Sequence, residues 1–377
     1  MYDFIPVNQP LLDGNEKKYL QECIDTGWIS SEGPFVRKFE ESFATKTGRK
    51  HGIAVTNGTA ALEAAVRALG IGDGDEVILP SFTIISCAAA VVRNGAIPVL
   101  VDSCPDTWNM DVSKIEQKIT RKTKAIMAVH IYGLPVDMEP LLKLARNHKL
   151  KVIEDAAEAI GQTYKDRQCG SMGDVSVFSF YPNKHITTGE GGMILTDSQE
   201  IAEKARSLRD LCFIPGQRFV HKELGWNLRM TNMQAALGMA QLEKLEFHIK
   251  KKREIGRKYN ELLKDVKGIQ IPLKAAEYAE NIYWVFGIVL KENIPFDAKK
   301  AMEQLAGEGI GTRPFFWPMH EQPVLREAGL FKNESYPVSE NIARRGFYIP
   351  SGLAINDEQI ERTAKSLIKI LKLKGTN

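Results

Sequence analysis

One lysine in this sequence stands in a setting that suits covalent chemistry. Lys184 falls between two apolar runs typical of strands, Val175–Phe180 and Met193–Leu195, and residues 189–192 before the second run read Gly-Glu-Gly-Gly. Glycines permit close approaches that a Cβ would block, so a bulky planar ligand can reach a lysine held here. The alternative is a solvated loop lysine, which is the ordinary state of lysine at an arbitrary position.

A second motif upstream favours the chemical interpretation. Residues 150–161, LKVIEDAAEAIG, read as a parallel strand that delivers Asp155 at its carboxyl end, where open α/β sheets bind ligands. A carboxylate beside a pyridine nitrogen keeps that nitrogen protonated, and the protonated ring draws electrons from a carbanion at the attached carbon. A lysine amine forms a Schiff base with an aldehyde and, once released, moves protons. Asp155 and Lys184 therefore predict a pyridoxal phosphate site.

A third segment suits the phosphate of such a cofactor. His51–Thr59 reads as a strand that turns into a helix over Thr59–Leu69, with Thr59 as the predicted cap. The free amides at the start of a helix, together with the helix dipole, bind anions. Alone, this segment is a common strand-to-helix turn. Beside Asp155 and Lys184 it is interpreted as the phosphate site.

The predicted elements are those of an α/β protein. Strand-like and helix-like runs alternate from residue 51 to residue 196, which is typical of a mostly parallel sheet with flanking helices. A charge-rich helical stretch begins at Phe247, and a smaller α/β unit follows and ends in a helix over Asp357–Leu371. We therefore predict a large domain of residues 1–245 and a small C-terminal domain of residues 246–377. The polar stretch Cys212–Glu223 is expected to be irregular.

The composition excludes several classes of protein. The 377 residues are 44% hydrophobic and 26% charged, and a formal net charge of +3 is too balanced to indicate nucleic acid as the main partner. The five cysteines are odd in number and lack metal-ligand spacing, which predicts no metal site and favours a reducing cytoplasm. No signal peptide and no apolar stretch of about 18 residues is visible. We expect a cytoplasmic protein without a membrane span.

Motifs spread over nearly the whole chain resemble the DegT/DnrJ/EryC1/StrS family of sugar aminotransferases. They are Gly27–Ser31, Asn57–Leu62, Asp75–Ile78, Glu154–Gly161, Lys184–Gly192 and Asn227–Thr231. The family has the aspartate aminotransferase fold, fold type I of the pyridoxal phosphate enzymes. The resemblance therefore implies a sheet of the seven-stranded, mostly parallel type and pyridoxal 5'-phosphate as the cofactor.

The resemblance also implies cofactor contacts beyond Asp155 and Lys184. Gly58, Thr59 and Ser179 are expected to bind the phosphate. Phe82 matches an aromatic residue that stacks on the pyridine ring, with core packing as the alternative. Glu158 matches a residue that contacts the phenolic oxygen, where a carboxylate needs a shared proton or a raised pKa because two adjacent anions repel.

Members of this family are homodimers whose active sites are completed by the neighbouring subunit. Asn227 and Arg229 match residues that reach across to the cofactor phosphate, and a surface or interface salt bridge is the alternative for Arg229. The remaining candidates are substrate contacts, although Trp28 is equally well interpreted as a residue that packs its loop onto the body. These candidates are Trp28, Ser30, His185, Arg313 and His320.

The predicted reaction moves an amino group from L-glutamate to C4 of a nucleotide-linked 4-keto-6-deoxy sugar. By resemblance the sugar is GDP-4-keto-6-deoxy-D-mannose and the product GDP-perosamine, a precursor for the O-antigen of lipopolysaccharide. Sugars linked to dTDP or UDP stay open as alternatives because loops make the contacts to the base.

Two further alternatives come from related proteins. A branch of the family dehydrates the same GDP-sugar at C3 and carries histidine in place of the lysine, whereas here Lys184 is present and His185 is merely adjacent. Other relatives were first described as regulators, which would use the fold without turnover. The intact set of Asp155, Lys184 and Arg229 argues against lost catalysis.

Overall fold

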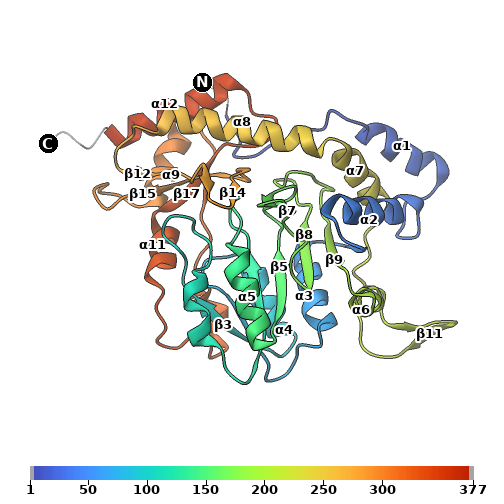
Figure 1. The fold of residues 1–377 in the computed structure, drawn as a ribbon. Coiled ribbons are helices and arrows are strands. Elements are labelled where there is room, and N and C mark those ends of the chain that lie inside the picture. Colours follow the sequence, from blue (N-terminus) through green and yellow to red (C-terminus); the bar gives the residue numbers. More distant parts are fainter. Residues whose placement is uncertain (1–3, 373–377) are drawn as a thin grey trace.

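A seven-stranded sheet forms the centre of the molecule (Figure 1). The computed structural model describes residues 4–372, apart from the side chain of Arg218. The strands lie in the order β1 (His51–Val55), β9 (Gly192–Thr196), β8 (Val175–Ser179), β5 (Lys151–Asp155), β4 (Thr123–Val129), β2 (Glu76–Pro80) and β3 (Ile97–Val101). Neighbours run parallel except at β9, which is antiparallel to β1 and β8. The predicted α/β fold with a mostly parallel sheet is confirmed.

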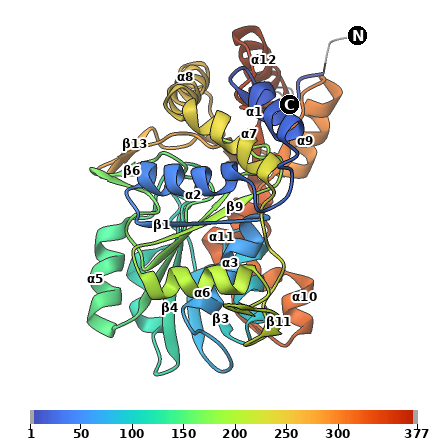
Figure 2. The ribbon, with the colours of Figure 1, turned by 90° about the vertical axis from the view of Figure 1, so that its right-hand side faces the viewer.

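Helices cover both faces of this sheet because its central strands are apolar on both sides. In β4, Ala125 and Met127 pack into one core with α3 and α4, whereas Ile126 and Ala128 pack into another with α5. Figure 2 shows α2 crossing above these layers and α6 near β1. The helices of this large unit are α1 (Glu16–Thr26), α2 (Pro34–Thr47), α3 (Gly58–Ala68), α4 (Ile85–Arg93), α5 (Met138–His148), α6 (Gln199–Arg209) and α7 (Asn232–Glu243).

A smaller unit packs beside the large one, around the antiparallel sheet β12-β15-β17-β16. Its strands are β12 (Ile269–Gln270), β15 (Phe286–Leu290), β16 (Arg313–Pro314) and β17 (Gly346–Ile349). Its helices are α8 (Leu245–Leu263), α9 (Ala298–Gly307), α10 (Pro323–Glu327), α11 (Pro337–Arg345) and α12 (Asp357–Lys372). Short hairpins β6 (Thr163–Tyr164) with β7 (Arg167–Gln168), and β13 (Ala275–Ala276) with β14 (Ala279–Glu280), lie between the units.

The division into residues 1–245 and 246–377 stays a prediction, and its outer ends, residues 1–3 and 373–377, lie outside the described part of the chain. Helix α8 does begin at Leu245, and it joins the two units. The N-terminal segment, however, packs with the small unit. Ile5 is buried in that unit's core and forms a bridge with Ile310. The core of the small unit therefore includes a residue from the start of the chain.

The stretch Cys212–Glu223, expected to be irregular, contains a hairpin. Strands β10 (Phe213–Ile214) and β11 (Gln217–His221) pair antiparallel around Pro215 and Gly216, and the glycine has a φ of +77°. Figure 1 shows this hairpin projecting from the body near α6. Among residues 4–372, we find no helix with the length and apolar character needed to span a bilayer.

Candidate active site

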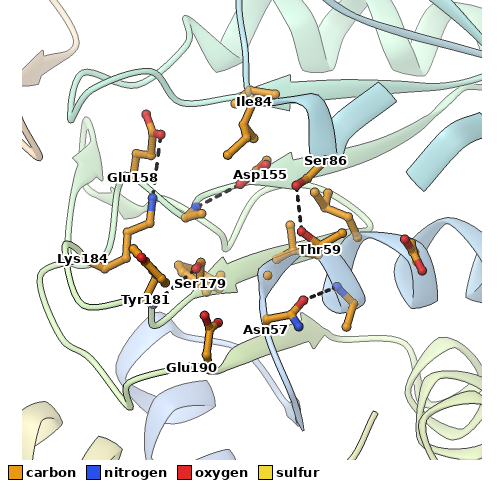
Figure 3. A pocket seen from close by; sticks show the side chains of 18 of the residues that line it. Asn57, Thr59, Ile84, Ser86, Asp155, Glu158, Ser179, Tyr181, Lys184 and Glu190 are labelled. Atoms are coloured by element: carbon orange, nitrogen blue, oxygen red, sulfur yellow. Dashed lines mark hydrogen bonds and ion pairs between the residues drawn. The ribbon is translucent and has the colours of Figure 1, made fainter. Parts of the chain in front are cut away.

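The predicted lysine and aspartate meet in one cavity of about 690 Å³. It lies where β5 and β8 end and α3 begins, at the carboxyl edge of the parallel strands, as expected for an open α/β sheet. Figure 3 shows polar side chains from these segments pointing toward one another. Those from the sequence-predicted set that line it are Gly58, Thr59, Asp155, Glu158, Ser179 and Lys184.

Sheet register explains why residues so distant in sequence converge. Asp155, the last residue of β5, is paired with Val177 of β8, so Ser179 and the lysine segment continue past the same edge. Gly192 of β9 is in register with both Ser179 and Val55. The residues after Val55, which start α3, are thereby set beside Ser179.

Lys184 is held in a buried position with its amine in the cavity. Its side chain is only 10% exposed, and Nζ lies 3.8 Å from Oε1 of Glu158 (Figure 3). On another side, Nζ lies 3.8 Å from the centre of the Trp284 ring. Burial lowers the pKa of Lys184, while the nearby carboxylates of Glu158 and Asp155 oppose that shift. The amine is thus easier to deprotonate than a lysine in water, as an acid–base group requires.

Asp155 is buried, and both of its carboxylate oxygens have a donor. The amide of Ala157 donates to Oδ1 at 3.1 Å, and the thiol of Cys87 donates to Oδ2 at 3.3 Å. Burial raises the pKa of Asp155, although these hydrogen bonds act in the opposite direction. Burial also raises the pKa of the Cys87 thiol well above its ordinary value, so this donor stays neutral.

Glu158 is fixed by a backbone contact that depends on an unusual conformation. The amide of Tyr132 donates to Oε2 of Glu158 at 3.0 Å, and Tyr132 has a φ of +56°, which is uncommon outside glycine. Burial raises the pKa of Glu158 to about 7, and the charge of Lys184 partly offsets this rise. Near neutral pH this carboxyl can therefore carry a proton.

The start of α3 forms a cradle at the other end of the cavity. The helix begins at Gly58, and Oδ1 of Asn57 accepts from the amide of Ala60 at 2.8 Å, so the predicted cap at Thr59 was wrong by two residues. The Thr59 hydroxyl is 2.7 Å from that of Ser86 and faces the cavity instead (Figure 3). A Cβ on Gly58 would lie 2.8 Å from Cβ of Ser179, so only glycine fits against this serine.

The structure does not place Phe82 in the cavity, which contradicts the predicted stacking position. The Phe82 side chain is fully buried and packs against the rings of Tyr132, Phe315 and Phe316. The alternative interpretation, core packing, is the one observed. Ile84, two residues later, lines the cavity instead and is 43% exposed.

The two histidines predicted to contact substrate are buried away from the cavity. Both ring nitrogens of His320 are engaged, Nδ1 with the Ser81 hydroxyl at 2.9 Å and Nε2 with Glu340 at 3.0 Å. His185 is 1% exposed, and burial holds its pKa well below the usual range. The structure places neither side chain at the cavity, because His185 is buried within the lysine segment and His320 within the turn Met319–Glu321.

Asn227 and Arg229 lie outside the cavity of their own chain. Asn227 is exposed and forms a bridge with Asp210, and Arg229 forms an ion pair with the same aspartate. Their proposed role toward a neighbouring subunit stays a prediction. The alternative for Arg229, a surface salt bridge, is what the single chain shows.

The other substrate candidates lie on the surface of this chain. Trp28 is 48% exposed, so its ring is half covered and both interpretations stay open, and the backbone amide of Asn232 donates to the carbonyl of Ser30 at 2.7 Å. Arg313 is exposed and pairs in β-sheet register with Tyr348, which lines the cavity. Their contacts with substrate stay predictions.

Several cavity residues escaped the sequence interpretation. They are Ile84, Ser86, Trp284, Phe316 and Tyr348. Cys87 does not line the cavity, but its thiol donates a hydrogen bond to Asp155. Ser86 and Cys87 lie in the first turn of α4, shortly after β2 ends, and the apolar run Val77–Leu79 is the signal that points to such a position. Trp284 and Tyr348 come from the small unit, and no local pattern in the sequence points to them.

Comparison with known proteins identifies the family. Residues 10–368 match the DegT/DnrJ/EryC1/StrS aminotransferase family. GDP-perosamine synthases of Caulobacter vibrioides and Escherichia coli O157:H7 are each 42% identical to the chain, over 97% of it and 98% of their own length.

Solved structures agree on the fold. Helicobacter pylori PseC, an aminotransferase involved in the biosynthesis of pseudoaminic acid, superposes with a TM-score of 0.92 at 26% identity, covering 98% of this chain and 99% of that one. A sugar aminotransferase of Streptococcus pneumoniae, solved in a PLP-form and a PMP-form, shares the fold with a TM-score of 0.91 at 23% identity, covering 98% of each chain. From its cavity, its sheet and its match over nearly its whole length, the chain belongs to the DegT/DnrJ/EryC1/StrS aminotransferase family.

Proposed function

We propose that this enzyme is a pyridoxal 5'-phosphate-dependent aminotransferase that moves the amino group of L-glutamate to C4 of GDP-4-keto-6-deoxy-D-mannose, giving GDP-perosamine. The observation that carries the proposal is the convergence of Lys184, Asp155 and Glu158 in one cavity beside the start of α3. The choice of nucleotide and sugar is supported by 42% identity to two GDP-perosamine synthases over nearly the whole chain.

The donor set of the cavity fits pyridoxal phosphate. A primary amine, a doubly hydrogen-bonded carboxylate and the hydroxyls of Thr59 and Ser179 line one space. Gly58 lets the start of α3 approach Ser179 closely, because a Cβ there would lie 2.8 Å from Cβ of the serine. We propose that Gly58, Thr59 and Ser179 hold the phosphate at the amino end of α3, where amides and the helix dipole favour an anion.

The reaction follows from what each side chain can do. When bound, pyridoxal phosphate supplies an electron sink for a carbanion at the carbon that carries the amine. Asp155 would keep the ring nitrogen protonated, and Ala157 and Cys87 hold its carboxylate in place for that role. Lys184 would anchor the cofactor and then, as a free amine, take and return the proton at the reacting carbon. Glu158, with its raised pKa, would share a proton with the phenolic oxygen.

The assembly and location proposed for the enzyme follow the family pattern. We infer a cytoplasmic homodimer in which Asn227 and Arg229 of one subunit complete the phosphate site of the other. Neither residue lines the cavity of its own chain, although Leu228 between them does, and this position at the cavity's edge supports contacts with a second copy.

An absorbance experiment tests both the reaction and the substrate. The purified protein is loaded with pyridoxal phosphate, then treated with L-glutamate, and finally with GDP-4-keto-6-deoxymannose. We expect glutamate to convert the lysine-bound cofactor to its pyridoxamine form and the keto sugar to reverse the change. Conversion by glutamate with reversal only by a dTDP- or UDP-linked sugar would refute the nucleotide. Absence of a lysine-bound cofactor would refute the enzyme and favour a regulator.

A further inference from the structure

Trp284 lines the cavity within contact distance of Lys184, yet none of the roles above uses it. It lies two residues before β15 in the small unit and is 4% exposed. Nζ of Lys184 lies 3.8 Å from the centre of its ring, well inside the range of a cation–π contact. Because Lys184 is itself largely buried, this contact is made in a desolvated site, where such contacts are strongest.

One hydrogen bond holds the indole ring of Trp284, and another holds its backbone. Its Nε1 donates to the carbonyl of Asn183 at 2.8 Å, which ties the ring to the residue just before Lys184. The buried amine of Lys252, on α8, donates to the backbone carbonyls of Trp284 and Ser351 at 2.7 and 2.6 Å. The ring is therefore held by the lysine segment through Asn183, and the backbone of Trp284 is held by α8 through Lys252.

The amine of Lys184 experiences opposing influences in this site. Burial disfavours its ammonium form, whereas the indole face and the two carboxylates favour it. The titratable groups that act on Lys184 are Asp155 at the end of β5, Glu158 just beyond it, Cys87 on α4 and the neighbouring His185. Of the groups that favour the ammonium, Glu158 and Asp155 have cofactor roles of their own, so the indole face is free to serve the lysine alone.

We propose that the indole face of Trp284 is the docking position of the free Lys184 side chain. It holds the side chain of that lysine in the cavity when the lysine is not bonded to the cofactor, and it does so most strongly after the amine has taken up a proton. Trp284 is thus a positioning residue for the lysine that carries protons. Its importance for turnover rests on the proposed function, whereas its contact with Lys184 does not.

The decisive measurement is the pKa of Lys184 in Trp284 variants. Competitive acetylation of the full-length protein across a pH series, with and without pyridoxamine phosphate, gives the titration of each lysine by peptide mass spectrometry. In Trp284→Leu we expect the pKa of Lys184 to fall by about 1, a tenfold change, because the ammonium loses its aromatic partner. Trp284→Phe keeps a ring face but loses the indole N–H, and should show a smaller fall.

A matched control separates this effect from a general loss of tryptophan. Trp317 is 46% exposed and has the guanidinium of Arg344 over its ring at 5.5 Å, so Trp317→Leu removes a surface cation–π contact elsewhere. We expect Trp317→Leu to leave the titration of Lys184 unchanged. If Trp284→Leu does not fold, Trp284→Met against Trp284→Phe makes the same comparison, because a thioether fills volume without a ring face.

The outcomes also distinguish this inference from the proposed function. With keto sugar as acceptor, the acidic limb of the kcat profile should move to lower pH in Trp284→Leu, in step with the pKa of Lys184, because this lysine takes the proton as a neutral amine. An unchanged Lys184 titration in Trp284→Leu would overturn the inference even if the enzyme transaminates normally. A shifted titration in a protein that accepts no keto sugar would uphold the lysine contact and refute the proposed function.

Discussion

At the scale of single residues, the proposed mechanism assigns Lys184 both the anchoring of the cofactor and the transfer of protons. We predict that Lys184→Ala lowers turnover by roughly 10² to 10⁴-fold or more, the range typical of losing a positioned acid–base group. The fold should persist because the side chain makes its contacts within the cavity. Steady-state transamination and far-ultraviolet circular dichroism measure the two parts. Residual turnover near that of the wild type would remove Lys184 from the mechanism.

Glu158 links the site to the pH dependence of stability. Burial raises its pKa from 4.5 to about 7, so the folded protein without cofactor binds this proton more tightly than the unfolded chain. The resulting stability is present below pH 4.5 and is lost as pH rises through about 7. Glu158→Gln has no proton to lose, so its stability relative to the wild type should increase across that window, by up to about 1.4 kcal/mol per pH unit.

Urea denaturation of the cofactor-free protein at several pH values tests this prediction. Glu327→Gln, at an exposed position on α10, is the control and should run parallel to the wild type. Parallel curves for Glu158→Gln and the wild type would show that Glu158 does not take up a proton on folding.

The residues of the site differ in how well the sequence predicts them. Lys184 and Asp155 are found because few residue types can do their chemistry and both stand at strand ends. Phe82 was misplaced because an aromatic residue after a strand suits a cavity wall and a core equally well. His320 was misplaced because its burial depends on Ser81 and Glu340, which tertiary packing alone brings to it.

At the scale of elements, the sheet positions the lysine segment against the phosphate cradle. Gly192 opens β9, and a Cβ there would lie 2.4 Å from the carbonyl oxygen of Asn57 and 2.9 Å from the amide of Gly58. We predict that Gly192→Ala pushes the start of α3 away and raises the dissociation constant of pyridoxal phosphate by roughly tenfold, since overpacking costs about 1–3 kcal/mol.

The control for this prediction is another glycine without such a neighbour. Gly307, at the end of α9, has no atom within 4 Å of an added Cβ, so Gly307→Ala should bind the cofactor like the wild type. Fluorescence titration with pyridoxal phosphate gives both constants. Equal affinities in the two variants would mean that β9 and the cradle can separate without loss.

Helices and strands were predicted well where the spacing of apolar residues is regular, and the residues at which they begin were predicted less well. The parallel strands read as apolar runs because helices cover both faces of the sheet. The cap of α3 was misplaced because Asn57 and Thr59 are both good capping residues. The hairpin β10–β11 was missed because its pairing is carried by the backbone around a Pro-Gly turn, and its polar side chains resemble those of a loop.

At the scale of the whole molecule, the position of Arg229 implies that catalysis depends on whether the chain forms a dimer. Lys184 and Asp155 line the same cavity, whereas Arg229 lies outside it and forms an ion pair with Asp210 in the single chain. If Arg229 serves the neighbouring subunit, a hybrid dimer of Lys184→Ala and Arg229→Ala chains contains one fully intact site. Hybrids of Lys184→Ala and Asp155→Ala chains contain none.

We therefore predict that mixing, unfolding and refolding the Lys184→Ala and Arg229→Ala proteins in equal amounts restores about a quarter of wild-type turnover. Half of the random dimers are hybrids, and each hybrid has one of two sites intact. The Lys184→Ala and Asp155→Ala mixture, treated identically, should stay inactive because both changes damage the same cavity. Recovery in neither mixture, with dimers confirmed by light scattering, would place Arg229 outside shared catalysis and leave its pair with Asp210 as a surface contact.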